Sequence, residues 1–418
     1  MANAIYAQSG GVTAVINASA CGVIKAWRDK AGDTAKLYAA ENGIVGVLNE
    51  ELIDTSLESM EDIEALLHTP GGAFGSCRYK LKKLDEDDRE YKRLIDVFRA
   101  HDVRYFFYNG GNDSADTCLK VSQVADSLGY KLHAIHIPKT IDNDLVITDN
   151  CPGFGSVAKY IAVSIKEAAL DLESMSATST KVFILETMGR NAGWIAASSG
   201  IITNPDSKAP HIILFPEIPF NQEVFLAKVK ETVAKYDSCV IVASEGLRGE
   251  DGKIVTSSST TDAFGHQQLG GVATFLVKMI TKQLNFKCHY AISDYLQRSA
   301  RHIASKTDVK QAYELGVVGV KLALDGHNAV MPYILRISEK PYKWEIKFAK
   351  LEDIANKEKF MPRDFIDAEG FHITQKCRDY IEPLIYGEDY PPYVNGVPEY
   401  VKLKNKKITK KLEKKKEV

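Results

Sequence analysis

The stretch LHAIHIPKTIDND, residues 132–144, decides the fold class of this chain. Its first part, residues 132–137, is a short apolar run that ends at Pro138, as expected of a buried strand. The next residues bring a lysine, a threonine hydroxyl and two carboxylates to the end of that strand. Because charged groups beside a buried strand are costly unless they bind a ligand or do chemistry, this turn predicts a functional site at the carboxyl edge of a parallel sheet.

A short apolar strand, a glycine turn and an amphipathic helix follow one another elsewhere in the chain. The strand and turn pairs are residues 4–7 with Gly10-Gly11, residues 103–108 with Gly110-Gly111, and residues 181–185 with Gly189. Strands that alternate with helices predict a doubly wound α/β sheet. Right-handed crossovers then place the glycine turns at one edge of the sheet.

Glycine turns at strand ends are typical of phosphate binding, because backbone N–H groups and helix N-termini can approach the phosphate closely there. Each turn alone is a weak signal, whereas three turns beside clustered carboxylates are a stronger one. The sequence has no GxxxxGK[ST] motif and no complete GxGxxG motif. P-loop enzymes and dinucleotide dehydrogenases are therefore disfavoured.

The two carboxylates of the opening stretch suit phosphoryl transfer. Asp142 and Asp144 are two residues apart in an extended segment and would point the same way. One would take the proton of a hydroxyl, and the other would arrange Mg²⁺ or its waters. Lys139 and Arg190 would supply positive charge for the transferred group. The alternative is a solvated acidic loop, which the adjoining buried strand disfavours.

Composition is that of a globular protein with two domains. The chain has 418 residues, of which 45% are hydrophobic and 26% charged, with a net charge of −2. Residues 402–418 hold nine lysines and two glutamates, so this end carries +7 and the remainder −9. We expect a solvated tail, and the acidic body argues against nucleic acid as a partner.

The cysteines and the apolar runs indicate a cytoplasmic protein. The seven cysteines are scattered, and none is spaced as CxxC, which is typical of reduced thiols rather than disulfides or zinc sites. The first residues lack the basic region of a signal peptide, and no apolar run approaches the length of a membrane span. We therefore expect no membrane partner.

Five motifs resemble, in order, those of the 6-phosphofructokinase family, and the likeness extends to about residue 325. They are GGNDS at 110–114, PKTIDND at 138–144, MGR at 188–190, SEG at 244–246 and YLQR at 295–298. The second motif is highly specific, whereas lipid and NAD kinases share versions of the first. The resemblance implies two doubly wound, Rossmann-like α/β domains with the active site in the cleft between them, plus a C-terminal extension.

The expected domains follow from this resemblance and from composition. A donor-binding domain would comprise residues 1–155 with about 297–345. A domain for fructose 6-phosphate would comprise residues 156–296 with about 346–400. Residues 401–418 are expected to be a basic, flexible tail.

Two positions indicate which phosphate donor is used. ATP-dependent members have glycine where this chain has Asp113 and Lys139. A carboxylate at 113 would repel the α-phosphate of a nucleotide, and the lysine would favour a smaller polyanion. Aspartate followed by lysine is the pattern of the pyrophosphate-dependent members. The resemblance therefore implies Mg²⁺-dependent, reversible phosphoryl transfer from pyrophosphate to fructose 6-phosphate, a step of glycolysis and gluconeogenesis.

Individual roles carry over onto matching positions. Asp142 would accept the proton of the 1-hydroxyl, Thr140 would contact the transferred group, and Asp144 would lie near the metal. Gly10 and Arg78 would bind the diphosphate, with help from Lys80. The residues that would bind the sugar phosphate are Thr140, Ile141, Asp142, Met188, Gly189, Arg190, Glu245, Tyr295, Leu296, Gln297 and Arg298.

The sequence departs from the family pattern at several positions. Asn112 replaces an aspartate that helps to hold Mg²⁺ in many relatives, and a neutral amide oxygen is a weaker ligand. Lys181 replaces an arginine that reaches a neighbouring subunit's 6-phosphate site. Lysine keeps the positive charge but lacks the paired N–H donors of a guanidinium. The resemblance therefore implies a homodimer or higher oligomer. Tyr295 and His289 replace a histidine and an arginine of ATP-dependent bacterial members. We expect a non-allosteric enzyme.

Two other functions stay open from the sequence. One is an ATP-dependent 6-phosphofructokinase that tolerates Asp113. The other is a non-catalytic, sugar-phosphate-binding regulatory subunit, which Asn112 favours and the intact Thr140, Asp142 and Asp144 oppose.

Overall fold

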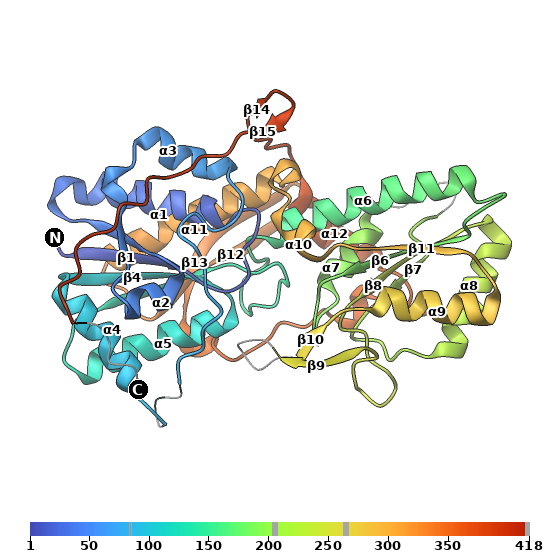
Figure 1. The fold of residues 1–418 in the computed structure, drawn as a ribbon, viewed down its shortest axis with the longest axis horizontal. Helices are drawn as coiled ribbons and strands as arrows, with labels where there is room; N and C mark the ends of the chain where they lie inside the picture. The colour runs from blue at the N-terminus through green and yellow to red at the C-terminus, as the bar shows by residue number, and fades with distance from the viewer. Residues whose placement is uncertain (83, 85, 203–207, 262–266, 414–418) are drawn as a thin grey trace. The chain divides into compact units, whose positions relative to one another are not determined.

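The computed structural model divides the chain into two compact units (Figure 1). Unit 1 comprises Met1–Gly153, Lys306–Glu358 and Gly387–Val418, and unit 2 comprises Phe154–Ser305 and Lys359–Tyr386. The structure describes residues 1–82, 84, 86–202, 208–261 and 267–413. Residues 346–358 and 387–400, expected in the sugar-binding domain, thus lie in unit 1, whereas residues 154–155 and 297–305, expected in the donor-binding domain, lie in unit 2.

A seven-stranded sheet forms the centre of unit 1, in the order β13-β12-β5-β4-β1-β2-β3. The strands are β1 Asn3–Gln8, β2 Leu37–Ala40, β3 Leu52–Asp54, β4 Val103–Gly110, β5 His133–Pro138, β12 Val330–Glu339 and β13 Tyr342–Lys350. Strands β2, β1, β4, β5 and β12 pair in parallel, and the edge strands β3 and β13 are antiparallel to their neighbours. Pairing of β13 with β12 explains why residues 346–358 belong to unit 1.

Helices cover both faces of this sheet because consecutive strand residues point to opposite sides. Phe106 of β4 packs against Phe98, with ring centroids 5.4 Å apart, whereas Phe107 packs against Trp27 on the other side, at 6.1 Å. The helices of unit 1 are α1 Ile16–Ala31, α2 Gly43–Leu48, α3 Met60–Ala65, α4 Arg89–Ala100, α5 Asn112–Ser127 and α11 Lys306–Leu324. The expected doubly wound α/β architecture is confirmed here (Figure 1).

Unit 2 is built on a four-stranded, fully parallel sheet in the order β11-β6-β8-β7. The strands are β6 Val182–Thr187, β7 Ile212–Leu214, β8 Cys239–Ser244 and β11 Cys288–Ile292. Its helices are α6 Phe154–Met175, α7 Trp194–Ser198, α8 Gln222–Tyr236, α9 Val272–Leu284, α10 Asp294–Ser299 and α12 Gln375–Ile381. Two further strands, β9 Ser257–Thr261 and β10 Gln267–Leu269, pair antiparallel.

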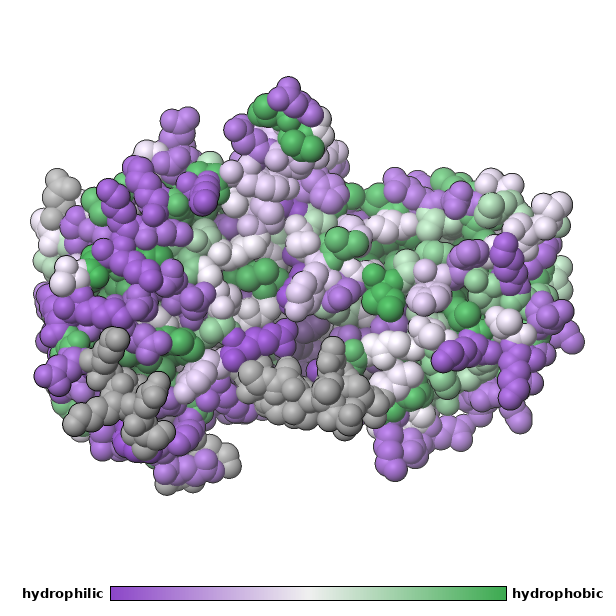
Figure 2. Space-filling view, viewed as in Figure 1, coloured by the Kyte–Doolittle hydropathy of each residue, from purple (hydrophilic) through white to green (hydrophobic). Residues whose placement is uncertain are grey.

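The lysine-rich C-terminal segment lies along unit 1 as far as residue 413, rather than extending into solvent as expected. The N–H of Asp54 donates to the carbonyl of Lys406 at 3.0 Å, and the N–H of Ile408 donates to Leu52 at 2.9 Å. The segment therefore extends the sheet beyond β3, and this part of the surface of unit 1 carries many hydrophilic side chains among smaller hydrophobic patches (Figure 2). Residues 414–418, the rest of the expected tail, are outside the described part.

Two buried carboxylates hold this C-terminal segment. Glu58 accepts the N–H groups of Lys404 and Asn405 at 3.1 and 2.8 Å. Glu50, which also lies 2.5 Å from the His101 ring, accepts those of residues 411 and 412. A run of lysines in sequence looks solvated, but here distant acidic side chains bind its backbone. Within the described ranges, no helix has the length and apolar character needed to cross a membrane.

Candidate active site

In unit 1, the predicted diphosphate-binding turn follows β1. Gly10 has a φ of +75°, which favours glycine. Its N–H donates to the carbonyl of Cys77 at 2.9 Å, and the hydroxyl of Ser76 donates to the Gly10 carbonyl at 2.7 Å. These bonds join the turn to the segment that carries the exposed Arg78. The structure therefore brings the Gly10 turn next to the backbone that leads into Arg78.

The ammonium of Lys139 lies directly behind this turn. The residue is 3% exposed, and Nζ donates to the carbonyls of Ser9 at 2.7 Å and Gly11 at 2.6 Å. A Cβ placed on Gly10 would lie 3.5 Å from Nζ. The positive charge is thus fixed beside the backbone that would contact a diphosphate, and it also stabilises the turn itself.

The second glycine turn leads from β4 into helix α5. Asp113 lies in the first turn of this helix, where its side chain is 43% exposed and 3.7 Å from Nζ of Lys80. Its neighbour Asn112 is engaged on both sides of its amide: Oδ1 accepts the N–H of Asn356 at 3.0 Å, and Nδ2 donates to the carbonyl of Lys357. The two adjacent residues therefore differ, since the Asp113 side chain is partly open to solvent and the Asn112 amide holds a distant loop.

Residues 140–144 form a closed turn after β5. The N–H of Thr140 donates to the carbonyl of Pro152 at 3.2 Å, and the Thr140 hydroxyl oxygen accepts the N–H of Asp142 at 3.1 Å. Asn143 has a φ of +55° and accepts the N–H of Cys151 at 3.0 Å. These bonds fix the backbone that carries the two carboxylates, while the Ile141 side chain is buried.

Asp144 is the most perturbed carboxylate of this turn. Burial, followed by the charges of Asp142 and Glu358, raises the pKa of Asp144 to about 7. Its Oδ1 is buried and accepts no hydrogen bond from the described residues. A buried carboxylate oxygen without a donor suits a cation, so Asp144 fits a Mg²⁺ ion. No group of three or more His, Cys, Asp or Glu side chains in the described ranges is arranged to hold a metal. An ion would therefore depend on substrate oxygens and water, as is usual for Mg²⁺.

In unit 2, the predicted sugar-binding residues gather at the carboxyl ends of three neighbouring strands. Met188, Gly189 and Arg190 follow β6, Glu245 follows β8, and residues 295–298 lie on α10 just after β11. Parallel pairing in the order β11-β6-β8 places all three strand ends at one edge. The tertiary structure thus brings together segments that are more than a hundred residues apart in the chain.

Hydrogen bonds connect these three segments. The N–H of Met188 donates to Oε1 of Gln297 at 3.3 Å, and that of Gly189 donates to Oε1 of Glu245 at 3.4 Å. Burial raises the pKa of Glu245, although the Gly189 N–H and the charge of Arg190 act in the opposite direction. Gln297 is 1% exposed and is therefore part of the framework.

Helix α10 carries the remaining predicted residues, of which Arg298 is half-buried. Tyr295 and Leu296 are 62% and 64% exposed, and the guanidinium of Arg298 lies over the Tyr295 ring, 3.9 Å from its centroid. A guanidinium beside an aromatic ring suits an anionic sugar phosphate.

Lys181 is the predicted site residue that lies apart from the others in unit 2. It precedes β6, whereas Met188 follows it, so about 20 Å of extended strand separates them. Its ammonium forms an ion pair with Asp237. Lys181 therefore contributes nothing to the sugar-binding edge of its own chain.

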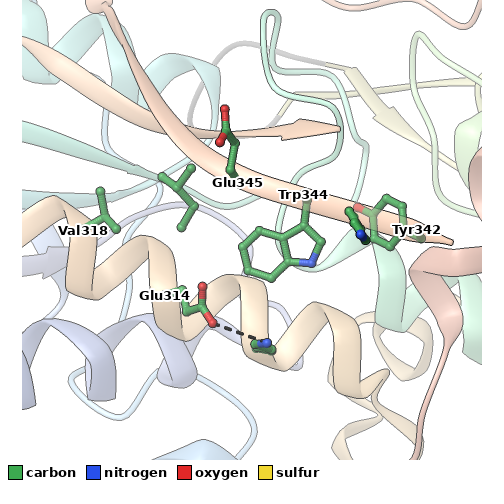
Figure 3. Close-up of a pocket in the computed structure, with 8 residues that line it drawn as sticks. Glu314, Val318, Tyr342, Trp344 and Glu345 are labelled. Atoms are coloured by element: carbon green, nitrogen blue, oxygen red, sulfur yellow. Dashed lines mark ion pairs between the residues drawn. The ribbon is translucent and has the colours of Figure 1, made fainter. Parts of the chain in front are cut away.

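An open pocket lies elsewhere in unit 1, between α11 and β13 (Figure 3). The Trp344 ring and the ion pair of Lys310 with Glu314, at 3.7 Å, form part of its lining. None of the predicted site residues lines this pocket.

Sequence reasoning missed two features of the site. The charge of Glu358 contributes, after burial and the charge of Asp142, to the raised pKa of Asp144, although no local motif marks Glu358. Gly246 is needed for close packing, because a Cβ there would lie 2.1 Å from the carbonyl oxygen of Arg190. Gly246 is the last residue of the SEG motif, but only its tertiary contact with Arg190 explains why a glycine is needed there.

Comparisons with known proteins agree with this arrangement. A family model described as phosphofructokinase matches residues 3–323. A pyrophosphate–fructose 6-phosphate 1-phosphotransferase of Halomonas elongata is 62% identical over 410 residues, and one of Methylococcus capsulatus is 60% identical, each match covering 98% of both chains. The crystal structure of a pyrophosphate-dependent phosphofructokinase from Nitrosospira multiformis matches with a TM-score of 0.91 and 57% identity over 99% of both chains. The chain is therefore a member of the phosphofructokinase family.

Proposed function

We propose that this protein transfers a phosphoryl group reversibly from pyrophosphate to the 1-hydroxyl of fructose 6-phosphate, which yields fructose 1,6-bisphosphate and phosphate. The observation that carries the proposal is the fixed charge of Lys139 behind the Gly10 turn, combined with the carboxylate of Asp113 at the start of α5. Names of relatives that are 60% and 62% identical over nearly the whole chain support it.

In the proposed reaction, Asp142 accepts the proton of the 1-hydroxyl. The hydroxyl oxygen forms a bond to one phosphorus of pyrophosphate while the bridging P–O bond breaks, and phosphate leaves with the electron pair. The bonds around Thr140 hold the backbone of Asp142 in place, so little reorganisation is needed. Because the donor and product bonds are similar in energy, the reaction runs in both directions.

Donor selection is proposed to depend on charge and space. Gly10 and Arg78 contact the diphosphate, and Lys139 supplies positive charge from behind the turn. The Asp113 carboxylate repels the additional phosphate of a nucleotide, and Lys80 partly balances its charge. Surface pairs of this kind contribute little to stability, which is consistent with a role in selection.

Mg²⁺ would supply charge neutralisation of the phosphate oxygens when bound, and Asp144 would help to hold it. The buried Oδ1 of this side chain supports that role. Arg190, Met188 and Glu245 would contact the sugar, and Tyr295 with Arg298 would hold its 6-phosphate.

We further propose a cytoplasmic, non-allosteric homo-oligomer. Lys181 lies at the opposite end of β6 from the sugar-binding residues. A role in sugar-phosphate binding is therefore open to it only at the site of another subunit. Binding of sugar phosphate by Lys181 in another subunit would require at least a dimer.

The deciding experiment measures fructose 1,6-bisphosphate formation in a coupled assay with pyrophosphate or ATP as the donor. We expect turnover with pyrophosphate and Mg²⁺, and little with ATP. Comparable turnover with both donors would favour the ATP-dependent alternative. Binding of fructose 6-phosphate without turnover by either donor would favour a regulatory subunit.

A further inference from the structure

The sheet of unit 1 ends at β13, a nine-residue strand whose only sheet neighbour among the described residues is β12. Both backbone groups of Ile334 bond on the far side of β12. Its N–H donates to the Thr148 hydroxyl at 3.1 Å, and its carbonyl accepts the N–H of Asp149 at 2.8 Å. Ile346, opposite Ile334, therefore points its own peptide groups away from β12. Every second residue of β13 shares this orientation, so the edge is a template for a further strand.

The hairpin that carries this edge is fixed at its root. Nε of Arg336 donates to both carboxylate oxygens of Asp149, at 3.0 and 3.1 Å, and these two side chains are 12% and 14% exposed. The guanidinium also lies over the Tyr342 ring, 4.8 Å from its centroid. The Tyr342 hydroxyl accepts a bond from Nε2 of Gln311 on α11 at 3.0 Å. The edge is therefore preorganised, and pairing with another strand would order little additional chain.

The side chains of β13 divide into an apolar face towards α11 and a charged face. The first carries Tyr342, Trp344, Ile346 and Phe348, and the second carries Lys343, Glu345 and Lys347. Trp344 points toward α11 and Glu345 points away from it (Figure 3). An open pocket of about 490 Å³ lies between α11 and β13, and Phe348 is 44% exposed. A strand added at this edge would place its own side chains beside these apolar groups.

A second copy of β13 is complementary to the first in one register. A two-fold axis pairs identical strands antiparallel, with even-numbered residues opposite even-numbered ones, so that both apolar faces lie on the same side. When the axis passes at Ile346, Trp344 lies opposite the partner's Phe348, and Glu345 lies opposite the partner's Lys347. Aromatic pairs and opposite charges directly across from each other stabilise a sheet.

Charge disfavours the neighbouring registers. An axis at Glu345 places this carboxylate opposite its own copy and Lys343 opposite the partner's Lys347. An axis at Lys347 places two lysines opposite each other. Like charges directly across destabilise a sheet, and lysines on an edge strand usually prevent pairing. Of these three registers, the one at Ile346 gives each Lys347 a carboxylate as its opposite neighbour.

We propose that β13 is an interface between two copies of this chain, paired antiparallel about a two-fold axis at Ile346. The contact joins two seven-stranded sheets into one continuous sheet. It involves none of the predicted site residues, so the inference goes beyond the proposed function. A contact through Lys181 would belong to unit 2 and be separate from this one. Loss of the β13 contact should therefore halve the number of subunits per particle, with or without the contact through Lys181.

The first test reverses charges at the edge and measures assembly by sedimentation over a range of protein concentrations. Glu345→Lys and Lys347→Glu each place like charges opposite each other at two positions. Self-association of either variant should therefore weaken by about tenfold or more. The two variants should assemble with each other when they are mixed. Both substitutions in one chain should restore self-association, because opposite charges again face each other.

Lys92→Glu provides a matched control. Lys92 pairs with Asp88 at 2.6 Å, and these side chains are 52% and 42% exposed. The pair of Lys347 with Glu345 is similar, at 3.0 Å with 53% and 45% exposed. Because Lys92 lies on α4 and not on the sheet edge, its reversal should leave assembly unchanged. The control separates a general effect of charge from an effect at β13.

Ile346→Cys tests the register directly. Residues that form a hydrogen-bonded antiparallel pair have Cα atoms about 5.5 Å apart, which is within the range of a disulfide. Oxidised glutathione should therefore link two chains through position 346. Phe348→Cys is the control, because two cysteines at position 348 would lie about 14 Å apart along the paired strands. This variant should stay unlinked, as should the native chain.

Several results would overturn the inference. They are a native chain that sediments as a monomer at micromolar concentration, unchanged assembly of both single charge reversals, and failure of the combined reversal to restore assembly. Linkage through position 348 but not 346 would contradict the register. A monomer whose pocket beside Trp344 binds a small molecule would assign this surface to a ligand instead. Sedimentation requires no turnover, so absent pyrophosphate activity would count against the proposed function without altering these results.

Discussion

Nζ of Lys139 lies 2.7 Å from the carbonyl oxygen of Ser9, across 130 residues of sequence. A second bond, to Gly11, closes the ammonium over the turn that contains Gly10. Lys139 therefore has two roles, which the PKTIDND motif alone does not distinguish. It places positive charge at the proposed donor site, and it stabilises the turn that forms that site.

Replacing Lys139 with methionine should lower both stability and activity. Two hydrogen bonds from a charged donor are lost, so the free energy of unfolding should fall by about 3 kcal/mol. Turnover with pyrophosphate should fall by more than tenfold. Denaturant titration and the coupled assay measure these effects. Lys80→Met is the control, because its exposed ion pair should contribute less than about 1 kcal/mol. Unchanged stability of the Lys139 variant would contradict the structural role.

Replacing Asp113 with glycine should relax donor selection. The carboxylate that repels a nucleotide is removed, so ATP should begin to compete with pyrophosphate, and Asp113→Gly with Lys139→Gly should show measurable ATP turnover. Initial rates with each donor provide the measurement. Asp113→Asn keeps the volume without the charge, and it distinguishes repulsion from steric exclusion. If neither glycine variant binds ATP, position 113 does not select the donor.

Replacing Asp142 with asparagine should abolish turnover while binding is retained. An amide cannot accept the hydroxyl proton, so kcat should fall by about a hundredfold or more. The backbone bond to Thr140 remains, because it uses the Asp142 N–H. Calorimetry should therefore show nearly unchanged affinity for fructose 6-phosphate. A variant with normal kcat would remove Asp142 as the base.

Replacing Gly246 with alanine should disturb the sugar-binding edge. The new Cβ would lie 2.1 Å from the carbonyl oxygen of Arg190 and 2.5 Å from that of Gly189, so the turn after β6 must move. KM for fructose 6-phosphate should rise by about tenfold, with a smaller change in KM for pyrophosphate. Gly249→Ala is the control, because its nearest contact is a flexible Asp251 side chain at 3.2 Å. Equal effects of the two substitutions would argue against a specific role.

Replacing Glu58 with glutamine should release the C-terminal segment. One carboxylate oxygen that accepts an N–H becomes an NH₂ group, and the side chain is only 3% exposed. The free energy of unfolding should fall by about 1–3 kcal/mol, and proteolysis within residues 401–413 should accelerate. Glu51→Gln, at a 28% exposed ion pair, should cost less than about 1 kcal/mol. Unchanged proteolysis of the Glu58 variant would favour the flexible tail that composition suggested.

The sequence by itself determined the alternating α/β architecture and the identity of the motif turns. These features are local. Each consists of an apolar run, a glycine and the polar residues beside it, all close together in the chain. PKTIDND alone therefore marks the turn that carries Asp142.

Only the tertiary structure decided which distant residues complete each turn. Asn112 bonds to a carbonyl 245 residues away, and Glu58 binds a backbone more than 340 residues away. No local pattern encodes such pairs, because they depend on how the intervening chain folds. The lysine-rich composition accordingly suggested a free tail. In the structure, the buried carboxylates of Glu50 and Glu58 accept hydrogen bonds from the backbone N–H groups of that segment, which also supplies these buried oxygens with donors.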